Sequence, residues 1–234
     1  MYITGAFKIS PESIKAIEPT GDKRRIPPIK PSLLGWKKLD RAFRPAQLAC
    51  MAIGEALKEA KVQWPLTAAA ENTALLILTK DSNLLAIEEM YTEIQKYGVG
   101  KSNPGLFPWT VLNVIGGFAS IYFNIRGMNY TLSNEENSGL LPLIFAEDLL
   151  THSNIKRVII CELELLATNS SDYEFDKSKK GEYVNALVIQ NKAANLPPLN
   201  LNKFKYSAQK SILSQILEEY SAKVPGVLNE KSIY

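Results

Sequence analysis

The sequence predicts an α/β fold in which helices are layered around a mostly parallel five-stranded sheet. Short runs of β-forming residues alternate with segments of helical periodicity, and 46% of the 234 residues are hydrophobic, as in ordinary globular proteins. One run, Thr73–Thr79, is short and apolar almost throughout. Such a run is typical of a central parallel strand that helices cover on both faces.

Five segments are predicted to be strands, because each is short and most are rich in β-branched or aromatic residues. They are Tyr2–Ile9, Thr73–Thr79, 130–133, 157–165 and Tyr183–Gln190. The first strand ends at the Ser10-Pro11 pair. We expect it to form a strand–helix–strand unit with the second strand.

Two helices are predicted on either side of the second strand. The first begins at Asp40, which is expected to cap it, and continues to about residue 62. Its apolar residues are spread broadly enough for a core helix. The second is Leu84–Tyr97, and it is expected to stop at Gly98.

A long buried helix is predicted over residues 107–125, which are almost wholly apolar. Gly116 and Gly117 would each weaken an isolated helix by about 1 kcal/mol. The pair therefore indicates the close approach of another backbone.

The C-terminal part of the chain has a different pattern. Residues 168–182 are a loop by composition, and a break at Leu196-Pro197-Pro198 follows the last strand. One amphipathic helix is predicted over residues 207–220, with Ile212, Leu213, Ile216 and Leu217 on one face. We expect a domain over residues 1–192 and a C-terminal extension over residues 193–234.

Composition limits the classes of function. The 27 basic and 24 acidic residues are nearly balanced, which argues against a nucleic-acid surface. Cys50 and Cys161 form no CxxC or CxxH pair, so no disulfide, metal site or cofactor is expected. No apolar stretch is long enough for a membrane span, and the N-terminus lacks a signal-peptide pattern, so we expect a cytoplasmic protein.

Residues 20–31, TGDKRRIPPIKP, combine three consecutive basic residues with three prolines. The prolines exclude regular structure and predict an extended loop. Lys23, Arg24 and Arg25 are then either a solvated charge run or a contact surface for an acidic partner.

Residues 127–150 have the form of a strand, a tight polar turn and a helix that begins near Gly139. Such an element presents its turn residues to the N–H groups that open the helix, and several classes of enzyme place a nucleophile there. In this chain the turn carries Glu135 and Glu136.

Residues 103–150 resemble the N-terminal half of β-ketoacyl synthases of the thiolase-like fold. These enzymes carry the pattern SP-x-x-FP-x-x-V-x-N-x-x-x-G, then a strand, then T-A-C-S-S-G at the opening of a helix. The matching residues are Asn103-Pro104, Phe107-Pro108, Val111, Asn113, Gly117, Gly127, Tyr130-Thr131, Ser138-Gly139 and Leu140. The resemblance extends more loosely over residues 1–192 and implies one half of a thiolase-like fold.

The resemblance places Glu136 where the family has its nucleophilic cysteine. A carboxylate forms no stable acyl-thioester, which the condensation requires. The family's second half supplies two histidines and a lysine, whereas His152 is the one histidine of this chain and lies at the far end of the elbow helix. A surface or capping role is expected for it. The resemblance therefore implies that this chain does not run the condensation on its own.

The leading hypothesis is a catalytically silent subunit of the chain-length-factor type. Such proteins pair with an active β-ketoacyl synthase in fatty-acid or polyketide-type biosynthesis, and short ones resemble proteins of aryl polyene and flexirubin-type pigment synthesis. The implied partners are a full-length ketosynthase or a second copy of the chain, and an acyl carrier protein that Lys23, Arg24 and Arg25 would contact.

The resemblance also implies which residues form the dimer seam and the acyl tunnel. The seam strand is Tyr130, Thr131, Leu132 and Ser133. The tunnel-wall candidates are Val111, Ile115 and Phe118, and ordinary core packing is the alternative for these three.

Two other functions stay open. The chain is an enzyme if Glu136, tuned by like-charge coupling to Glu135, acts as a general base or decarboxylating group on an acyl or malonyl thioester. It is a self-assembling structural remnant if the helix over residues 207–220 covers the sheet face that the missing half would meet.

Overall fold

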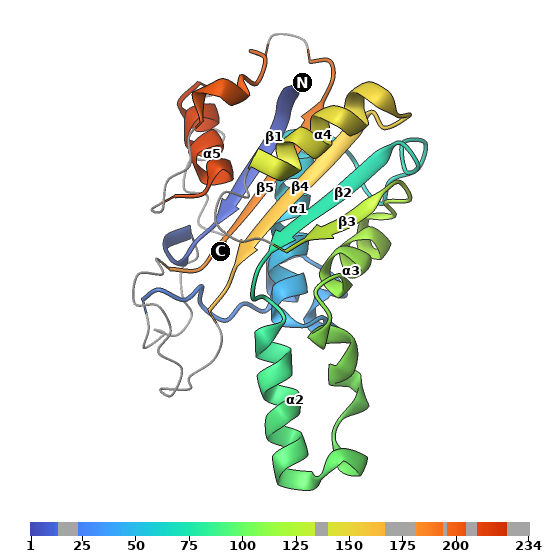
Figure 1. The fold of residues 1–234 in the computed structure, drawn as a ribbon, viewed down its shortest axis with the longest axis vertical. Helices are drawn as coiled ribbons and strands as arrows, with labels where there is room; N and C mark the ends of the chain where they lie inside the picture. Colours follow the sequence, from blue (N-terminus) through green and yellow to red (C-terminus); the bar gives the residue numbers. More distant parts are fainter. Residues whose placement is uncertain (14–22, 134–139, 167–180, 194–195, 205–209, 224–234) are drawn as a thin grey trace.

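The structure is a computed structural model that describes residues 1–13, 23–133, 140–166, 181–193, 196–204 and 210–223. Five strands form one mixed sheet with helices on both faces (Figure 1). The strands are β1 (Tyr2–Ile9), β2 (Thr73–Thr79), β3 (Asn129–Leu132), β4 (Arg157–Glu164) and β5 (Tyr183–Gln190). All five predicted strands are confirmed, with bounds that differ by one residue at most.

The strands lie in the order β1-β5-β4-β2-β3. β2 is parallel to β4 and β3, whereas β5 is antiparallel to its neighbours β1 and β4. Four strands therefore share one direction, and the prediction of a mostly parallel sheet is confirmed. β1 and β2 are parallel, as the expected strand–helix–strand unit requires, but they are not neighbours, because β5 and β4 lie between them.

Helices cover both faces of the sheet in the described part of the chain. α1 (Arg44–Glu59) and α3 (Val114–Phe123) pack on one face, and α4 (Leu140–His152) and α5 (Ile212–Lys223) pack on the other (Figure 1). Each face has its own buried apolar cluster, since alternate residues of a strand point to opposite faces.

Cys50 of α1 and Cys161 of β4 are free and buried in the first of these clusters, as predicted. Burial raises the pKa of both thiols, so they stay protonated and pack as small apolar side chains.

The expected helix cap at Asp40 is wrong. α1 begins at Arg44, and Pro45 lies in its first turn, where the missing N–H of proline costs nothing. Asp40 lies instead in a short 3-10 helix, Leu39–Arg41 (η3), where its Oδ1 accepts a hydrogen bond from the Ser32 N–H at 3.1 Å.

The single long helix predicted over residues 107–125 is also wrong. Pro104–Thr110 forms a 3-10 helix (η5), Val111 is extended, and α3 follows at an angle of 98° to η5. Pro108 lies inside η5, where it cannot donate the hydrogen bond that a continuous α-helix needs. Among the described helices, none alone has the length and apolar composition of a membrane span, and η5 and α3 pass that test only when joined.

The close approach predicted at the glycine pair is present at Gly116 only. A Cβ on Gly116 would lie 2.6 Å from Asn129 Oδ1 and 3.2 Å from Ile77 Cγ1, whereas a Cβ on Gly117 would meet open space. The neighbours are side chains of β3 and β2 rather than a backbone. Gly116 therefore lets α3 lie close to the sheet beside β3.

α2 (Leu84–Tyr97) has the predicted bounds, and Gly98 follows it with a φ of +81°. Of its residues, only Leu85 and Ala86 are buried. α2 packs against η5, and the two project together from the sheet as an arm, residues 84–110 (Figure 1). The arm carries exposed apolar side chains, namely Ile87, Tyr91, Tyr97, Val99 and Phe107.

The predicted amphipathic helix is confirmed as α5, although residues 207–209 at its predicted start lie outside the described part of the chain. Its predicted apolar face is buried against β1 and β5, with Ile212, Leu213, Ile216 and Leu217 each 5% exposed or less. The division into residues 1–192 and 193–234 stays a prediction.

Candidate functional site

The strand and the helix of the predicted elbow are both present. β3 ends at Leu132 and α4 begins at Leu140, with Pro142 in its first turn. Glu135 and Glu136 lie outside the described residues, so their role stays a prediction.

His152 is the last residue of α4, as predicted, and lies far from the turn. Leu140 is the first of the 13 residues of α4, so His152 lies about 18 Å from it along the helix axis, at 1.5 Å per residue. Its side chain is 72% exposed, and its Nδ1 lies 3.1 Å from Asp148 Oδ1 one turn earlier. These positions fit a surface residue at a helix C-terminus.

β3 is an edge strand of the sheet. It pairs with β2 on one side, and in the part of the chain that the structure describes no strand lies on its other side. Tyr130 is 42% exposed, Ser133 is exposed, and Thr131 and Leu132 are half-buried. Thr131 Oγ1 is buried without a hydrogen-bond partner among the described residues.

The opposite edge, β1, is covered. The Ala6 N–H donates to Glu59 Oε2 of α1 at 2.8 Å, and the Leu199 N–H donates to the Met1 carbonyl at 3.0 Å. Proteins protect sheet edges in this way against pairing with other chains. The two edges of this sheet therefore differ, and β3 is the edge left open within the described residues.

The helices α4 and α3, which contact β3 from the two faces of the sheet, both carry exposed apolar side chains. On one face, Tyr130 packs on Phe145 of α4 with the ring centroids 5.8 Å apart, and α4 exposes Leu141 at 47% and Ile144 at 48%. On the other face, Ile121 of α3 is 84% exposed. We name the strand β3 together with Leu141, Ile144 and Ile121 the β3 surface. Apolar surface of this kind beside an open edge is typical of a protein–protein interface.

The structure does not bring the three tunnel-wall candidates together on one surface. Val111 is 45% exposed at the break between η5 and α3, whereas Ile115 is 2% exposed and belongs to the core. Phe118 packs on Trp109 of η5 with the ring centroids 5.7 Å apart. Core packing describes Ile115 well, and the tunnel role of all three stays a prediction.

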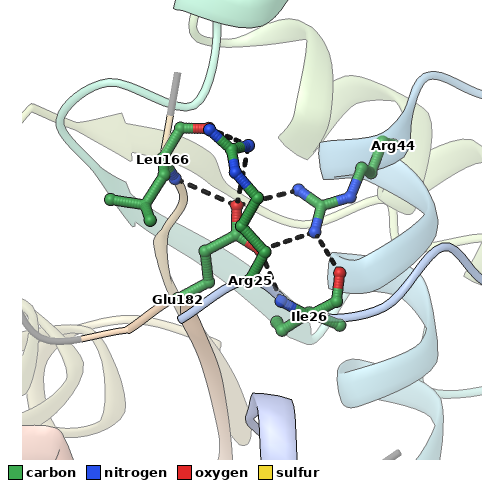
Figure 2. A network of polar contacts seen from close by, with 5 residues as sticks. All are labelled: Arg25, Ile26, Arg44, Leu166 and Glu182. Carbon is green, nitrogen blue, oxygen red and sulfur yellow. Dashed lines mark hydrogen bonds and ion pairs between the residues drawn. The ribbon is translucent and has the colours of Figure 1, made fainter. Parts of the chain in front are cut away.

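The basic residues of the N-terminal loop point in different directions. Lys23 and Arg24 are exposed, whereas Arg25 lies over Glu182, with its Nη1 3.2 Å from the Leu166 carbonyl and 3.9 Å from Glu182 Oε1 (Figure 2). Contact of the three with a carrier protein stays a prediction.

Glu182 is the centre of a buried network that the sequence did not predict. It is 1% exposed, and it accepts hydrogen bonds from the N–H groups of Ile26 at 2.8 Å and Leu166 at 3.1 Å (Figure 2). Both Nη atoms of Arg44 in α1 also donate to it, at 3.2 and 2.5 Å. The pattern gives no signal for this pairing, because Arg44 and Glu182 lie 138 residues apart.

No family model matches the chain, and no curated protein matches it. Solved structures do match it. The ishigamide ketosynthase/chain length factor matches at 20% identity and a TM-score of 0.64, over 85% of this chain and 64% of that one. The ketosynthase ApeO in complex with its chain length factor ApeC, from Xenorhabdus doucetiae, matches at 15% identity and a TM-score of 0.58, over 82% of this chain and 79% of that one.

A third matched structure is the AntDE:AntF complex of a type II PKS acyl-carrier protein with its ketosynthase bound to the hexaketide. A chain of this complex matches at 11% identity and a TM-score of 0.60, over 81% of this chain and 62% of that one. The chain thus spans less than two thirds of the first and third matched chains. These likenesses confirm the predicted fold: the chain has a thiolase-like α/β fold.

Proposed function

We propose that this chain is a chain-length-factor-type subunit that pairs with a complete β-ketoacyl synthase and does not condense acyl groups by itself. The observation that carries the proposal is the β3 surface, an open sheet edge flanked by exposed apolar side chains in a chain whose other edge is covered. Two of the matched structures are named as ketosynthase and chain-length-factor assemblies, which supports a ketosynthase as the partner.

The β3 surface fits a partner that supplies both a strand and an apolar face. A strand placed beside β3 would satisfy its outer N–H and C=O groups, and main-chain pairing of this kind gives affinity. Tyr130, Leu141 and Ile144 would then be buried in the centre of the interface, where aromatic and apolar side chains contribute most.

The biosynthetic context is part of the same proposal. The resemblance of residues 103–150 to ketosynthases supports fatty-acid or polyketide-type chemistry, and within it we propose the aryl polyene and flexirubin-type subgroup. Lys23 and Arg24 are exposed and basic, which supports contact with an acidic carrier protein. In this function Glu136 marks the lost nucleophile and Val111 contributes to the acyl tunnel.

Co-expression with a complete ketosynthase from the same genome, one that keeps the cysteine and both histidines, tests the pairing. We expect the two chains to purify together in equal amounts. Tyr130→Asp places a charge on the β3 surface and is expected to weaken the complex at least tenfold, a loss of about 1.4 kcal/mol. Leu33→Asp is the matched control, because Leu33 is 68% exposed in the loop between β1 and α1.

Circular dichroism of both variants checks that they fold. Purification of the wild-type chain as a stable monomer in the presence of the ketosynthase would overturn the proposal, and so would equal binding by Tyr130→Asp and Leu33→Asp.

A further inference from the structure

A buried polar cluster lies between α5 and the sheet. It consists of Glu162 on β4, Asn185 on β5, and Ser211 and Ser214 at the start of α5. Glu162 is 4% exposed, Asn185 is fully buried and Ser214 is 5% exposed. A carboxyl group in such a place is unusual, because burial without an ionic partner disfavours its charged form.

The hydrogen bonds of the cluster join the helix to the sheet. Ser211 Oγ donates to Glu162 Oε2 at 2.8 Å and accepts from the Ser214 N–H at 3.1 Å. The same hydroxyl group therefore caps α5 and binds the Glu162 carboxyl group. Asn185 Nδ2 donates to Glu162 Oε2 and to Ser214 Oγ, both at 2.9 Å. Asn185 Oδ1 is buried and has no hydrogen-bond partner among the described residues.

The rest of the contact between α5 and the sheet is apolar. Five side chains of α5 are buried against the second apolar cluster, namely Ile212, Leu213, Ile216, Leu217 and Tyr220. The strand residues of that cluster nearest the β1 edge are Ile3 and Ala6 of β1 and Leu187 and Ile189 of β5. α5 is thus an apolar cover over a sheet face, with a buried polar cluster at its N-terminus.

The charge of Glu162 opposes this docking. Burial raises the pKa of its carboxyl group to about 7 from the ordinary value of 4.5, and the charge of Glu164 on β4 also raises it, while hydrogen bonds from Asn185, Ser211 and Tyr183 lower it. Tyr183, on β5, is itself held protonated, since burial raises its pKa. At the start of α5, the Ser211 hydroxyl donates to Glu162, and the Ser214 hydroxyl accepts from Asn185. Among the described residues of these elements, no cation pairs with Glu162.

We propose that α5 is a pH-sensitive cover of the sheet, which docks most tightly when Glu162 is neutral and loosens when this carboxyl group ionises. Loosening would uncover Ile3, Leu187 and Ile189 and return Glu162 to water. Docked Glu162 binds its proton more tightly than released Glu162, so docking is strongest at low pH and weakens as the pH rises through the docked pKa. This inference does not depend on the proposed ketosynthase partner.

Hydrogen exchange of the full chain at pH 5.5 and 7.5 tests the proposal. After correction for the intrinsic exchange rate, we expect protection of the α5 amides to fall about twentyfold between these pH values, as the two pKa values imply. Protection of the α1 amides is the internal control and is expected to stay constant. In Glu162→Gln, which stays neutral at both pH values, α5 protection is expected to change less than twofold.

Equal pH dependence of α5 in Glu162→Gln and the wild type would overturn the proposal. A second measurement needs no variant: titration of the Glu162 carboxyl carbon by NMR in the wild-type chain. A midpoint near 7 supports the proposal, and a midpoint near 4.5 overturns it.

Discussion

At the scale of single residues, Glu182 connects three segments that lie far apart in the sequence. Its carboxylate joins Ile26 of the N-terminal loop, Arg44 of α1 and Leu166 after β4 (Figure 2). A buried carboxylate is stable only when it is paired and hydrogen-bonded, and Glu182 meets both conditions. Loss of the carboxylate would leave Arg44 and two backbone N–H groups without this acceptor.

We therefore expect Glu182→Ala to lower the free energy of unfolding by about 3–5 kcal/mol, because removal of one partner of a buried pair is strongly destabilising. Urea unfolding followed by tryptophan fluorescence measures the change. Glu218→Ala is the control, since Glu218 pairs with Lys210 where both side chains are exposed, and a loss below about 1 kcal/mol is expected. Similar losses in the two variants would contradict the role given to Glu182.

At the scale of elements, the arm differs from the other helices in how little of it is buried. α1 buries eleven of its residues, from Pro45 to Leu57, whereas α2 buries Leu85 and Ala86. Local stability follows the apolar contacts that an element makes. The free arm is then one of the least stable elements of the described structure.

Hydrogen exchange of the chain alone measures this difference. We expect amides of α2 after Glu88 to exchange at least a hundredfold faster than those in the middle of α1, since α2 has few contacts beyond η5. Equal protection of the two helices would show that the arm is stabilised by contacts other than those described.

At the scale of the whole molecule, the sheet has one covered edge and one open edge. An open edge beside exposed apolar residues is a template for pairing with any available chain. The chain without a partner is therefore expected to associate with itself, in proportion to its concentration.

Size-exclusion chromatography with light scattering measures this self-association. Thr131→Lys places a charge on β3, and we expect it to lower the apparent association constant at least tenfold. Leu33→Lys adds the same charge to an exposed apolar residue outside β3 and is expected to have little effect. A wild-type chain that stays monomeric at high concentration would contradict the prediction.

The sequence predicted the elements whose boundaries are set by local chemistry. β2 could be predicted from the sequence because its seven residues are buried on both faces and are therefore mostly apolar. The end of α2 could be predicted because Gly98 adopts a positive φ. The apolar face of α5 could be predicted because four apolar residues share one side of a helix, namely Ile212, Leu213, Ile216 and Leu217.

The features that depend on distant residues were not predictable in the same way. The pairing of Glu182 with Arg44 and the placement of Glu162 beneath α5 come from tertiary packing. The break at Val111 was missed because an apolar run looks alike whether it is straight or bent. The strand order of the sheet decides which strand lies at the open edge. This order differs from the order of the strands in the sequence, so the open edge could not be predicted from it.

The position of β5 in the sheet affects the order in which the strands can pair during synthesis of the chain. Among the described strands β1 pairs with β5 alone, and β5 is translated about 180 residues later. At about 5–20 residues per second, β1 therefore waits roughly 10–35 s for its partner. β2, β3 and β4 can pair with one another before that time. The N-terminal strand is thus among the last parts of the sheet to join it.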